Sequence, residues 1–227
     1  MTFLGTWIGR AIAGLVLLAL VAALWVYAIG WAPATAKYPI QGVDVSAAQG
    51  EIVWPTLAAR GADFAYIRAT AGAHGRDARF LDNWRGAAAA GLRRGVIHHW
   101  SFCDTGEAQA DNFVTTVPRN PNALPAVLEL DFTADCDVRP DRATLIARVK
   151  AFLVVAETHT GEPMLLKITK PVERAYQVSA AIPRPVWEVR AYFAPDYAVR
   201  PWRLWQASAM RRVDGVPQPV NWDVVTP

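Results

Sequence analysis

The sequence has few of the residues that common catalytic and binding motifs require. Of its 227 residues, only two are cysteine and four are histidine. His98 and His99 are neighbours that would point to opposite faces of a strand, and no other histidine has the spacing of a metal ligand. No serine lies in a Gly-x-Ser-x-Gly context, which disfavours a serine hydrolase. No dense cluster of Lys and Arg suggests a nucleic-acid surface. We therefore expect neither a metal site nor a nucleic-acid partner.

Charged side chains are absent from residues 11–32. At about 1.5 Å per residue, a helix of this length spans a hydrocarbon core of roughly 30 Å. Arg10 precedes the run, and the aromatic residues near its ends are typical of the two membrane interfaces. We expect a cytoplasmic N-terminus (1–10), a transmembrane anchor (11–32), a linker (33–38) and an extracytoplasmic, periplasmic domain (39–227). The alternative is a signal peptide cleaved at Ala34-Thr35-Ala36, which would make the domain secreted, although a signal core is usually about 7–15 residues long.

The two cysteines, Cys103 and Cys136, fit an oxidising compartment. Each follows the C-terminal end of a predicted strand. If those strands are neighbours, the two loops meet and the cysteines can form a disulfide. The alternative is a pair of unpaired buried thiols. Their spacing does not resemble that of a zinc site.

Beyond residue 39, predicted strands and helices alternate along the chain. We expect strands at 41–45, 64–69, 96–102, 124–132, 164–169, 186–192, 203–207 and 220–225, and helices at 54–60, 80–90, 104–117 and 141–158, with a short helix ending at 175. Asp104 and Glu107 resemble a capping box for the third helix. Such alternation is typical of a parallel α/β sheet. Because the last third is rich in strands without long helices, we expect an irregular TIM-like β/α barrel that follows one transmembrane helix.

Two acidic residues, Glu129 and Asp131, end an otherwise apolar predicted strand. Residues two apart on a strand share a face, so the two carboxylates would project side by side. Asp44 lies at another predicted C-terminal strand end, where barrels of this kind place their chemistry. A solvated strand end or a structural ion pair would explain a single acid. For two acids on the same face of a strand end we favour a carboxylate pair that carries out acid/base catalysis on a sugar.

An ordered set of short motifs resembles the family 25 glycoside hydrolases, the Chalaropsis-type lysozymes or N-acetylmuramidases. The motifs are Gly42-Val43-Asp44-Val45-Ser46 with Gln49-Gly50, Ile67-Arg68-Ala69-Thr70, Asn83-Trp84, Ala90-Gly91-Leu92 with Gly95, His98, Trp205-Gln206, and Val220-Asn221-Trp222-Asp223-Val224. Together they cover about residues 39–227. The resemblance implies an irregular β/α barrel that hydrolyses the β-1,4 bond between N-acetylmuramic acid and N-acetylglucosamine in peptidoglycan.

Carried over from the resemblance, Asp131 is the general acid/base, while Glu129 and Asp44 act on the anomeric side. The implied substrate-binding residues are His98, Trp205, Gln206, Trp222 and Asp223. For His98 the residues themselves favour the alternative of a hydrogen-bonded core histidine. Peptidoglycan glycan strands are the implied partner, no cofactor is implied, and we expect a monomer.

The sequence departs from the family pattern at its acidic residues. The family usually has Asp-x-Glu where this chain has Glu129-Leu130-Asp131, and Asn221 and Asp223 also stand in exchanged order. Two alternatives therefore stay open: a catalytically impaired domain that binds cell-wall glycan without cleaving it, and a hydrolase of another glycan.

Overall fold

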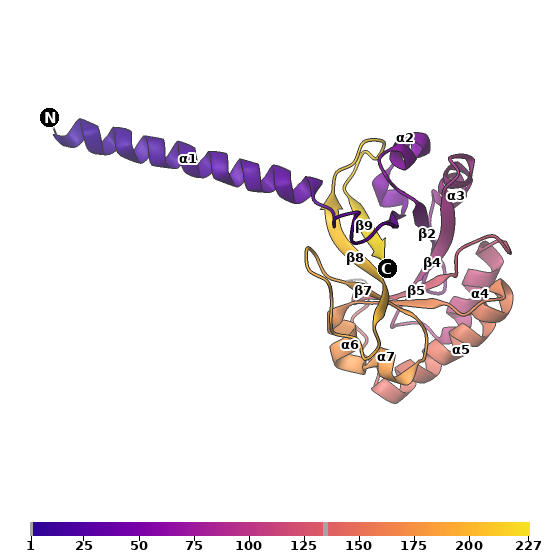
Figure 1. Cartoon of the computed structure of the whole chain (residues 1–227). Coiled ribbons are helices and arrows are strands. Elements are labelled where there is room, and N and C mark those ends of the chain that lie inside the picture. The colour runs from indigo at the N-terminus through magenta and orange to yellow at the C-terminus, as the bar shows by residue number, and fades with distance from the viewer. Residues whose placement is uncertain (1, 134–135) are drawn as a thin grey trace.

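The computed structural model describes residues 2–133 and 136–227, with only the backbone at 2–6 and 8. Met1, part of the predicted cytoplasmic N-terminus, lies outside the described residues. A long helix, α1 (Thr2–Gly30), projects from a rounded domain that the rest of the chain forms (Figure 1). Its stretch Gly9–Gly30 is long and apolar enough to cross a bilayer, and none of it is buried against the domain. The expected apolar N-terminal helix is therefore present, as a candidate membrane span.

The domain is a closed β/α barrel, as expected. Its strands are β1 (Gln41–Val45), β2 (Phe64–Ala71), β4 (Arg93–His99), β5 (Val127–Leu130), β6 (Leu165–Ile168), β7 (Val186–Val189), β8 (Trp202–Arg211) and β9 (Val220–Val225). Parallel pairings join β1 through β8, and β9 runs antiparallel between β8 and β1, which closes the sheet. A two-residue strand, β3 (Gly75–Arg76), pairs with the end of β2.

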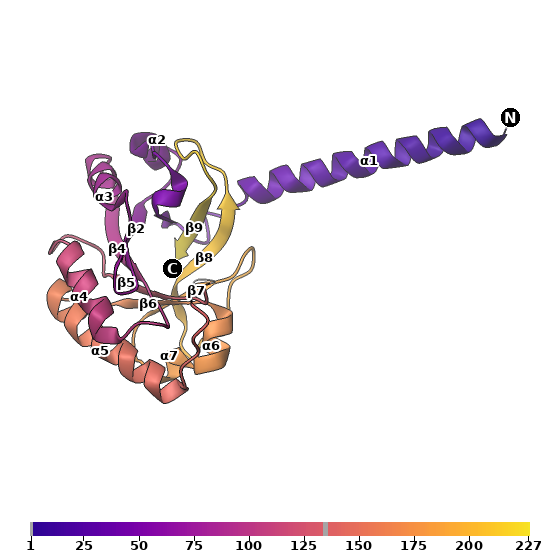
Figure 2. The same cartoon turned by 180° about the vertical axis from the view of Figure 1, so that it is seen from behind.

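Helices cover the part of the barrel formed by β2 to β7 (Figure 2). They are α2 (Trp54–Ala59), α3 (Phe80–Ala89), α4 (Gly106–Thr116), α5 (Arg142–Thr160), α6 (Lys170–Tyr176) and α7 (Val178–Ala181), with a 3-10 turn, η1, at Ala47–Gln49. The longest, α5, begins where the Asp141 side chain accepts a hydrogen bond from Thr144 N, and ends at Gly161 in a left-handed conformation. Both ends are therefore capped as helix termini require.

Several local predictions were wrong. The strands expected at 124–132 and 186–192 span only Val127–Leu130 and Val186–Val189. The helix expected at 104–117 begins at Gly106, and Thr105 rather than Asp104 caps it by accepting a bond from Ala108 N. The Asp104 carboxylate instead accepts a hydrogen bond from Ala73 N at 2.8 Å, so it fastens a neighbouring loop. The third strand spans Arg93–His99 instead of 96–102, because its last predicted residues belong to the loop that follows.

Alternating side chains divide the interior into two layers, as the two-residue period of a strand requires. One layer lies between the barrel and the helices. The other fills the lumen with the apolar side chains of Phe64, Tyr66, Ile97, Val127, Leu165, Trp187 and Leu204. Because strand residues nearer the C-terminal ends are polar, the lumen has an apolar floor and a charged layer above it.

The segment between α1 and β1 covers the outer face of β8 and β9. Trp31 and Tyr38 pack on Trp205, with ring centroids 6.4 and 5.7 Å from that indole. Pro33 and Tyr38 are buried, so the stretch predicted as a linker, residues 33–38, lies against the domain.

Candidate active site

Two carboxylates and one lysine meet in the barrel lumen. Asp44 on β1 and Glu129 on β5 each place a carboxylate oxygen next to Lys167 Nζ, at 2.8 and 3.0 Å. Lys167, on β6, is 1% exposed, and its Nζ lies 4.7 Å from the ring centroid of Trp187 in the apolar floor. Burial alone would lower the pKa of Lys167, but the two carboxylates raise it above its ordinary value. The lysine is therefore charged and bridges the two acids.

The second oxygen of Glu129 faces two further nitrogen groups. Arg68 Nη2 donates to Oε2 at 3.1 Å, and His99 Nδ1 lies 2.9 Å from the same atom. Burial alone would raise the pKa of Glu129, whereas Lys167, His99 and Arg68 together hold it well below the usual range. Glu129 is thus an ionised carboxylate fixed in position, which suits charge stabilisation better than proton donation.

Asp223 on β9 is a different kind of acid. It is fully buried, and neither carboxyl oxygen has a hydrogen-bond partner among the described residues. Burial and the neighbouring Asp44 raise the pKa of Asp223 well above its ordinary value. Asn221, two residues earlier, donates from Nδ2 to Asp44 Oδ1 at 2.8 Å. Asn221 therefore supplies an amide donor to Asp44, and burial favours the neutral form of the Asp223 carboxyl group.

Asp131 lies just beyond the C-terminal end of β5. Its Oδ1 accepts hydrogen bonds from Thr169 Oγ1 at 2.8 Å and from Phe132 N at 2.9 Å. The side chain is half-buried, and no ion pair joins it to a cation among the described residues. Unlike Glu129, it is held by neutral donors alone among the described residues.

Of the substrate-binding predictions, Gln206 and Asp223 lie in the barrel interior opposite each other in the β8–β9 pairing. The structure places His98 elsewhere, between the barrel and the helices. Its Nδ1 lies 2.8 Å from Thr70 Oγ1, its Nε2 lies 3.1 Å from Gln109 Oε1, and its ring packs on Phe152. Burial lowers the pKa of His98 to about 4. The histidine that reaches the carboxylates is its neighbour His99.

The two predicted tryptophans also lie away from the carboxylates. Trp205 is on the outer face of β8 and donates from Nε1 to Arg190 O at 2.7 Å. Trp222 belongs to the core outside the lumen and donates to Gln41 Oε1. The structure therefore does not bring these two rings beside the carboxylates.

Sequence reasoning missed Lys167, Arg68 and His99. One signal was present: Lys167 is the single charge within Leu165–Ile168, a strand otherwise apolar and fully buried. A lone buried charge needs a partner of opposite sign. The acids at the ends of other apolar strands, Asp44 and Glu129, were the candidates for that partner.

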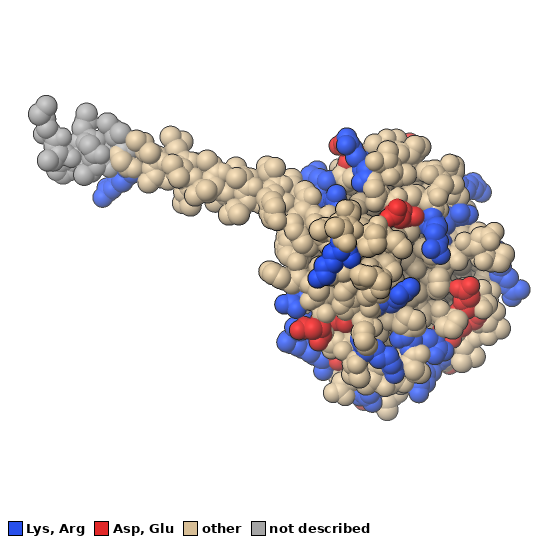
Figure 3. All heavy atoms as spheres, viewed as in Figure 1, with Lys and Arg blue, Asp and Glu red and all other residues tan. Residues whose placement is uncertain are grey.

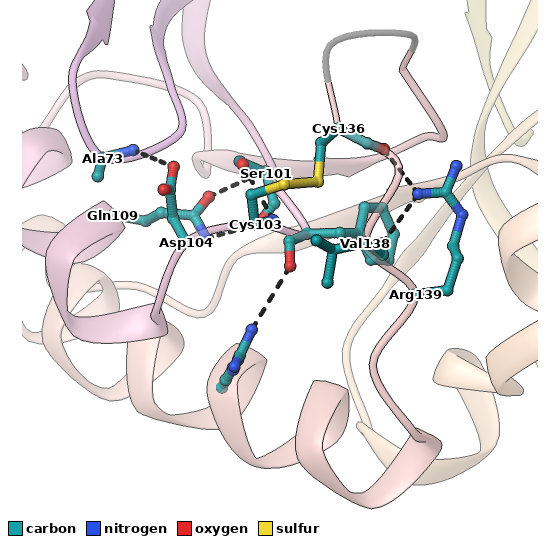
Figure 4. Close-up of a disulfide and its surroundings, with 10 residues drawn as sticks. Ala73, Ser101, Cys103, Asp104, Gln109, Cys136, Val138 and Arg139 are labelled. Carbon is teal, nitrogen blue, oxygen red and sulfur yellow. Dashed lines mark hydrogen bonds between the residues drawn. A yellow bond between two sulfur atoms is a disulfide. The ribbon is translucent and has the colours of Figure 1, made fainter.

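A disulfide joins the loops that follow β4 and β5, as the sequence predicted. Cys103 and Cys136 have Cα atoms 5.9 Å apart (Figure 4). Arg139 Nη1 donates to Cys136 O at 2.7 Å and also to Val138 O, and Ser101 Oγ accepts from Cys103 N. The disulfide therefore joins the chain downstream of Asp131 to the neighbouring loop, and the hydrogen bonds are local to each of the two loops.

The geometry of the barrel and its acids is that of one class of protein. A closed β/α barrel that gathers several acids, with Glu129 held as an anion and the pKa of Asp223 raised by burial, is suited to glycoside hydrolysis. The described residues contain no cluster of His, Cys, Asp and Glu that could hold a metal ion.

Comparisons with known proteins identify the family within that class. The model of glycosyl hydrolases family 25 matches residues 43–216. Protein YegX of Escherichia coli O6:H1, described as uncharacterized, is 31% identical over 196 residues, which cover 83% of this chain and 70% of that protein. Lysozyme M1 of Streptomyces globisporus is 30% identical over 203 residues, covering 78% of this chain and 64% of that protein. The chain belongs to glycosyl hydrolases family 25.

A solved structure agrees with this assignment. The family 25 glycosyl hydrolase from Bacillus anthracis superposes with a TM-score of 0.77 at 30% identity, covering 84% of this chain and 90% of that one. Family and fold together support a glycoside hydrolase of the peptidoglycan-degrading kind.

Proposed function

We propose that this chain is a membrane-anchored muramidase, which hydrolyses the β-1,4 bond between N-acetylmuramic acid and N-acetylglucosamine in peptidoglycan. One observation carries the proposal: Asp44 and Glu129 converge on Lys167 Nζ, which brings two acids from distant parts of the chain into one lumen. Family membership and the similarity to a lysozyme support it. The candidate span in α1 would anchor the domain on the extracytoplasmic side, where peptidoglycan lies.

In the proposed reaction, Asp131 is the general acid and then the base. Its protonated carboxyl donates to the glycosidic oxygen as the bond from that oxygen to the anomeric carbon breaks. The resulting carboxylate then takes a proton from a water molecule, whose oxygen adds to the anomeric carbon. The absence of an ion pair at Asp131 among the described residues supports this role, since a strong cationic partner would oppose protonation.

Glu129 and Asp44 would act on the opposite side of the bond. The three nitrogen groups at Glu129 keep its carboxylate ionised, so it can stabilise positive charge at the anomeric centre or orient a reacting N-acetyl group. Asp44, held by Lys167 and Asn221, would assist it. Preformed charges of this kind need no rearrangement during the reaction.

The test is release of muropeptides from peptidoglycan by the detergent-solubilised chain. Asp131→Asn should abolish products that end in reducing muramic acid, and Asp131→Glu should retain some. Asp137→Asn is the matched control, because Asp137 is an exposed acid on the same segment. If Asp131→Asn cleaves as fast as the wild type, Asp131 is not the acid. If the wild type releases no products, the muramidase proposal fails.

A second candidate function is glycan binding without cleavage. Lys167 favours binding without cleavage, because this buried cation contacts one carboxylate oxygen of Asp44 and one of Glu129. In that case the chain would pellet with peptidoglycan and release nothing, and Asp131→Asn would pellet equally well. A chain that neither cleaves nor pellets would argue against both functions.

A further inference from the structure

The helix α1 is joined to the barrel by direct contacts rather than by a free tether. Arg212 N donates to Ile29 O in the last turn of α1, at 2.7 Å. The ring of Trp31 lies 5.1 Å from that of Tyr192 and 6.4 Å from that of Trp205. The end of the helix is thus fastened to β8 and to the loop between β7 and β8.

The next residues are part of the folded domain. Gln41 Nε2 donates to both Pro33 O and Tyr38 O at 2.9 Å. Tyr38 is 6% exposed and packs on Trp202 and Trp205. Cleavage after Ala36 would remove Trp31 and Pro33 and uncover part of an aromatic sheet face. Retention of α1 therefore completes the domain and fixes the angle at which the helix leaves it.

The surface around this exit is aromatic and basic. Phe193 is 67% exposed, directly after Tyr192, with the Arg190 guanidinium 5.8 Å from its ring. Arg212 and Lys37 are also exposed. Figure 3 shows Lys and Arg side chains on the domain around the base of the helix. The acid Asp196 pairs with Arg190, with Oδ1 3.3 Å from Nη1, and is itself largely exposed. Aromatic rings with nearby cations are typical of the interfacial region of a bilayer.

We propose that Trp31, Tyr192, Phe193, Arg190 and Arg212 form a membrane-facing patch that binds anionic phospholipid headgroups of the bilayer that α1 spans. The continuity of the patch with the apolar helix identifies the partner, because a rigid exit brings these side chains to the headgroup level wherever α1 is inserted. The barrel is then held in one orientation on the membrane. This inference depends on α1 spanning the bilayer and does not depend on the chemistry at Asp131.

The test uses the full chain in nanodiscs that contain phosphatidylglycerol and spin-labelled, fluorescence-quenching lipids. Both native cysteines are in the disulfide, so an introduced cysteine is the one free thiol for a fluorescent label. Phe193→Cys reports on the patch. Val154→Cys is the matched control, because Val154 is 68% exposed on α5, which lies away from α1 in both views (Figures 1 and 2).

We expect several-fold stronger quenching of the label at 193 than at 154, with the difference reduced in phosphatidylcholine discs and by Arg190→Gln with Arg212→Gln. Trp31→Ala, which removes both ring contacts at the exit, should also reduce it. Equal quenching at the two positions would overturn docking in a fixed orientation. Equal quenching of the 193 label in neutral and anionic discs would overturn the headgroup preference. An intact-mass measurement showing that the chain from cells begins after Ala36 would overturn the proposal altogether.

Discussion

Replacing Lys167 by methionine should be the most damaging single change in the barrel lumen. The substitution keeps most of the side-chain volume above Trp187 but removes the charge that contacts Asp44 at 2.8 Å and Glu129 at 3.0 Å. Both acids would remain buried, at 6% and 8% exposed, beside the fully buried Asp223. Three acids would then share a lumen without the buried cation.

The expected loss in the free energy of unfolding follows from that geometry. Removing one partner of a buried ion pair costs about 3–5 kcal/mol, because the other charge is left uncompensated. Here one cation serves two acids, so we expect the upper end, about 5 kcal/mol at pH 7. A domain of this size has about 5–15 kcal/mol in total, and the variant should therefore be close to unfolding at neutral pH.

The loss should depend on pH. The folded pKa of Glu129 is depressed, so its contribution is present above its ordinary value of 4.5 and disappears as the pH falls through the lower folded value. The folded pKa of Lys167 is raised, so its contribution is complete below 10.5 and is lost as the pH rises through the higher folded value. Between pH 4.5 and pH 10.5 the wild type keeps the stabilising contributions of both Glu129 and Lys167. In Lys167→Met the uncompensated acids should take up protons, so the variant should gain stability from pH 7 to pH 5.

The assay is guanidinium unfolding of the detergent-solubilised chain, followed by circular dichroism at pH 5 and pH 7. Lys170→Met is the control, since Lys170 is half-buried on the adjoining α6 and forms no ion pair among the described residues. The control should change stability by less than about 1 kcal/mol. A loss for Lys167→Met as small as the control's, or one that does not vary between the two pH values, would refute the proposed charge compensation.

Three further predictions concern stability and use the same unfolding assay. Asp223→Asn should stabilise the chain at pH 7 but not below about pH 4. The raised pKa of folded Asp223 means that the wild-type acid destabilises the fold only at pH values above the ordinary pKa of an aspartate. A destabilised variant at pH 7 would contradict this. Between pH 6.5 and pH 4 the wild type should lose about 3 kcal/mol of stability, because His98 binds a proton in the unfolded chain but, with its folded pKa of about 4, not in the folded one. His98→Gln should remove this loss, and identical pH profiles for the two chains would argue against it. Cys103→Ser with Cys136→Ser should cost about 4 kcal/mol for a loop of 33 residues, and reduction of the wild type should reproduce the loss.

Much of the barrel could be predicted because its signals are local. Apolar runs ended by turn residues gave the strands, and helical spacing from Leu145 to Ala156 gave α5. The pair Glu129 and Asp131 could be placed at a strand end from the sequence alone. The direction each side chain faces was harder to predict. A one-residue error in the phase of a strand exchanges lumen for outer core, and this separates His98 from His99.

The rest of the site depends on contacts between distant residues. Lys167 and Asp44 are 123 residues apart, and no local pattern joins them. Trp205 would be expected in a sugar site by its neighbours in the sequence, but the segment from Trp31 to Tyr38 packs over it. That packing joins segments far apart in the sequence, so no local pattern predicts it.

The longer acid at position 129 fits the groups that surround it. Glu129 reaches Lys167, Arg68 and His99 with contacts of 2.9 to 3.1 Å. An aspartate there would withdraw the carboxylate by over 1 Å, a displacement that can cost about 10²-fold in rate. We therefore expect Glu129→Asp with Asp131→Glu, which restores the usual family order, to lower muropeptide release rather than raise it. Glu129→Asp alone should account for most of the loss. A double variant more active than the wild type would mean that the surrounding cations have not adapted to the longer side chain at position 129.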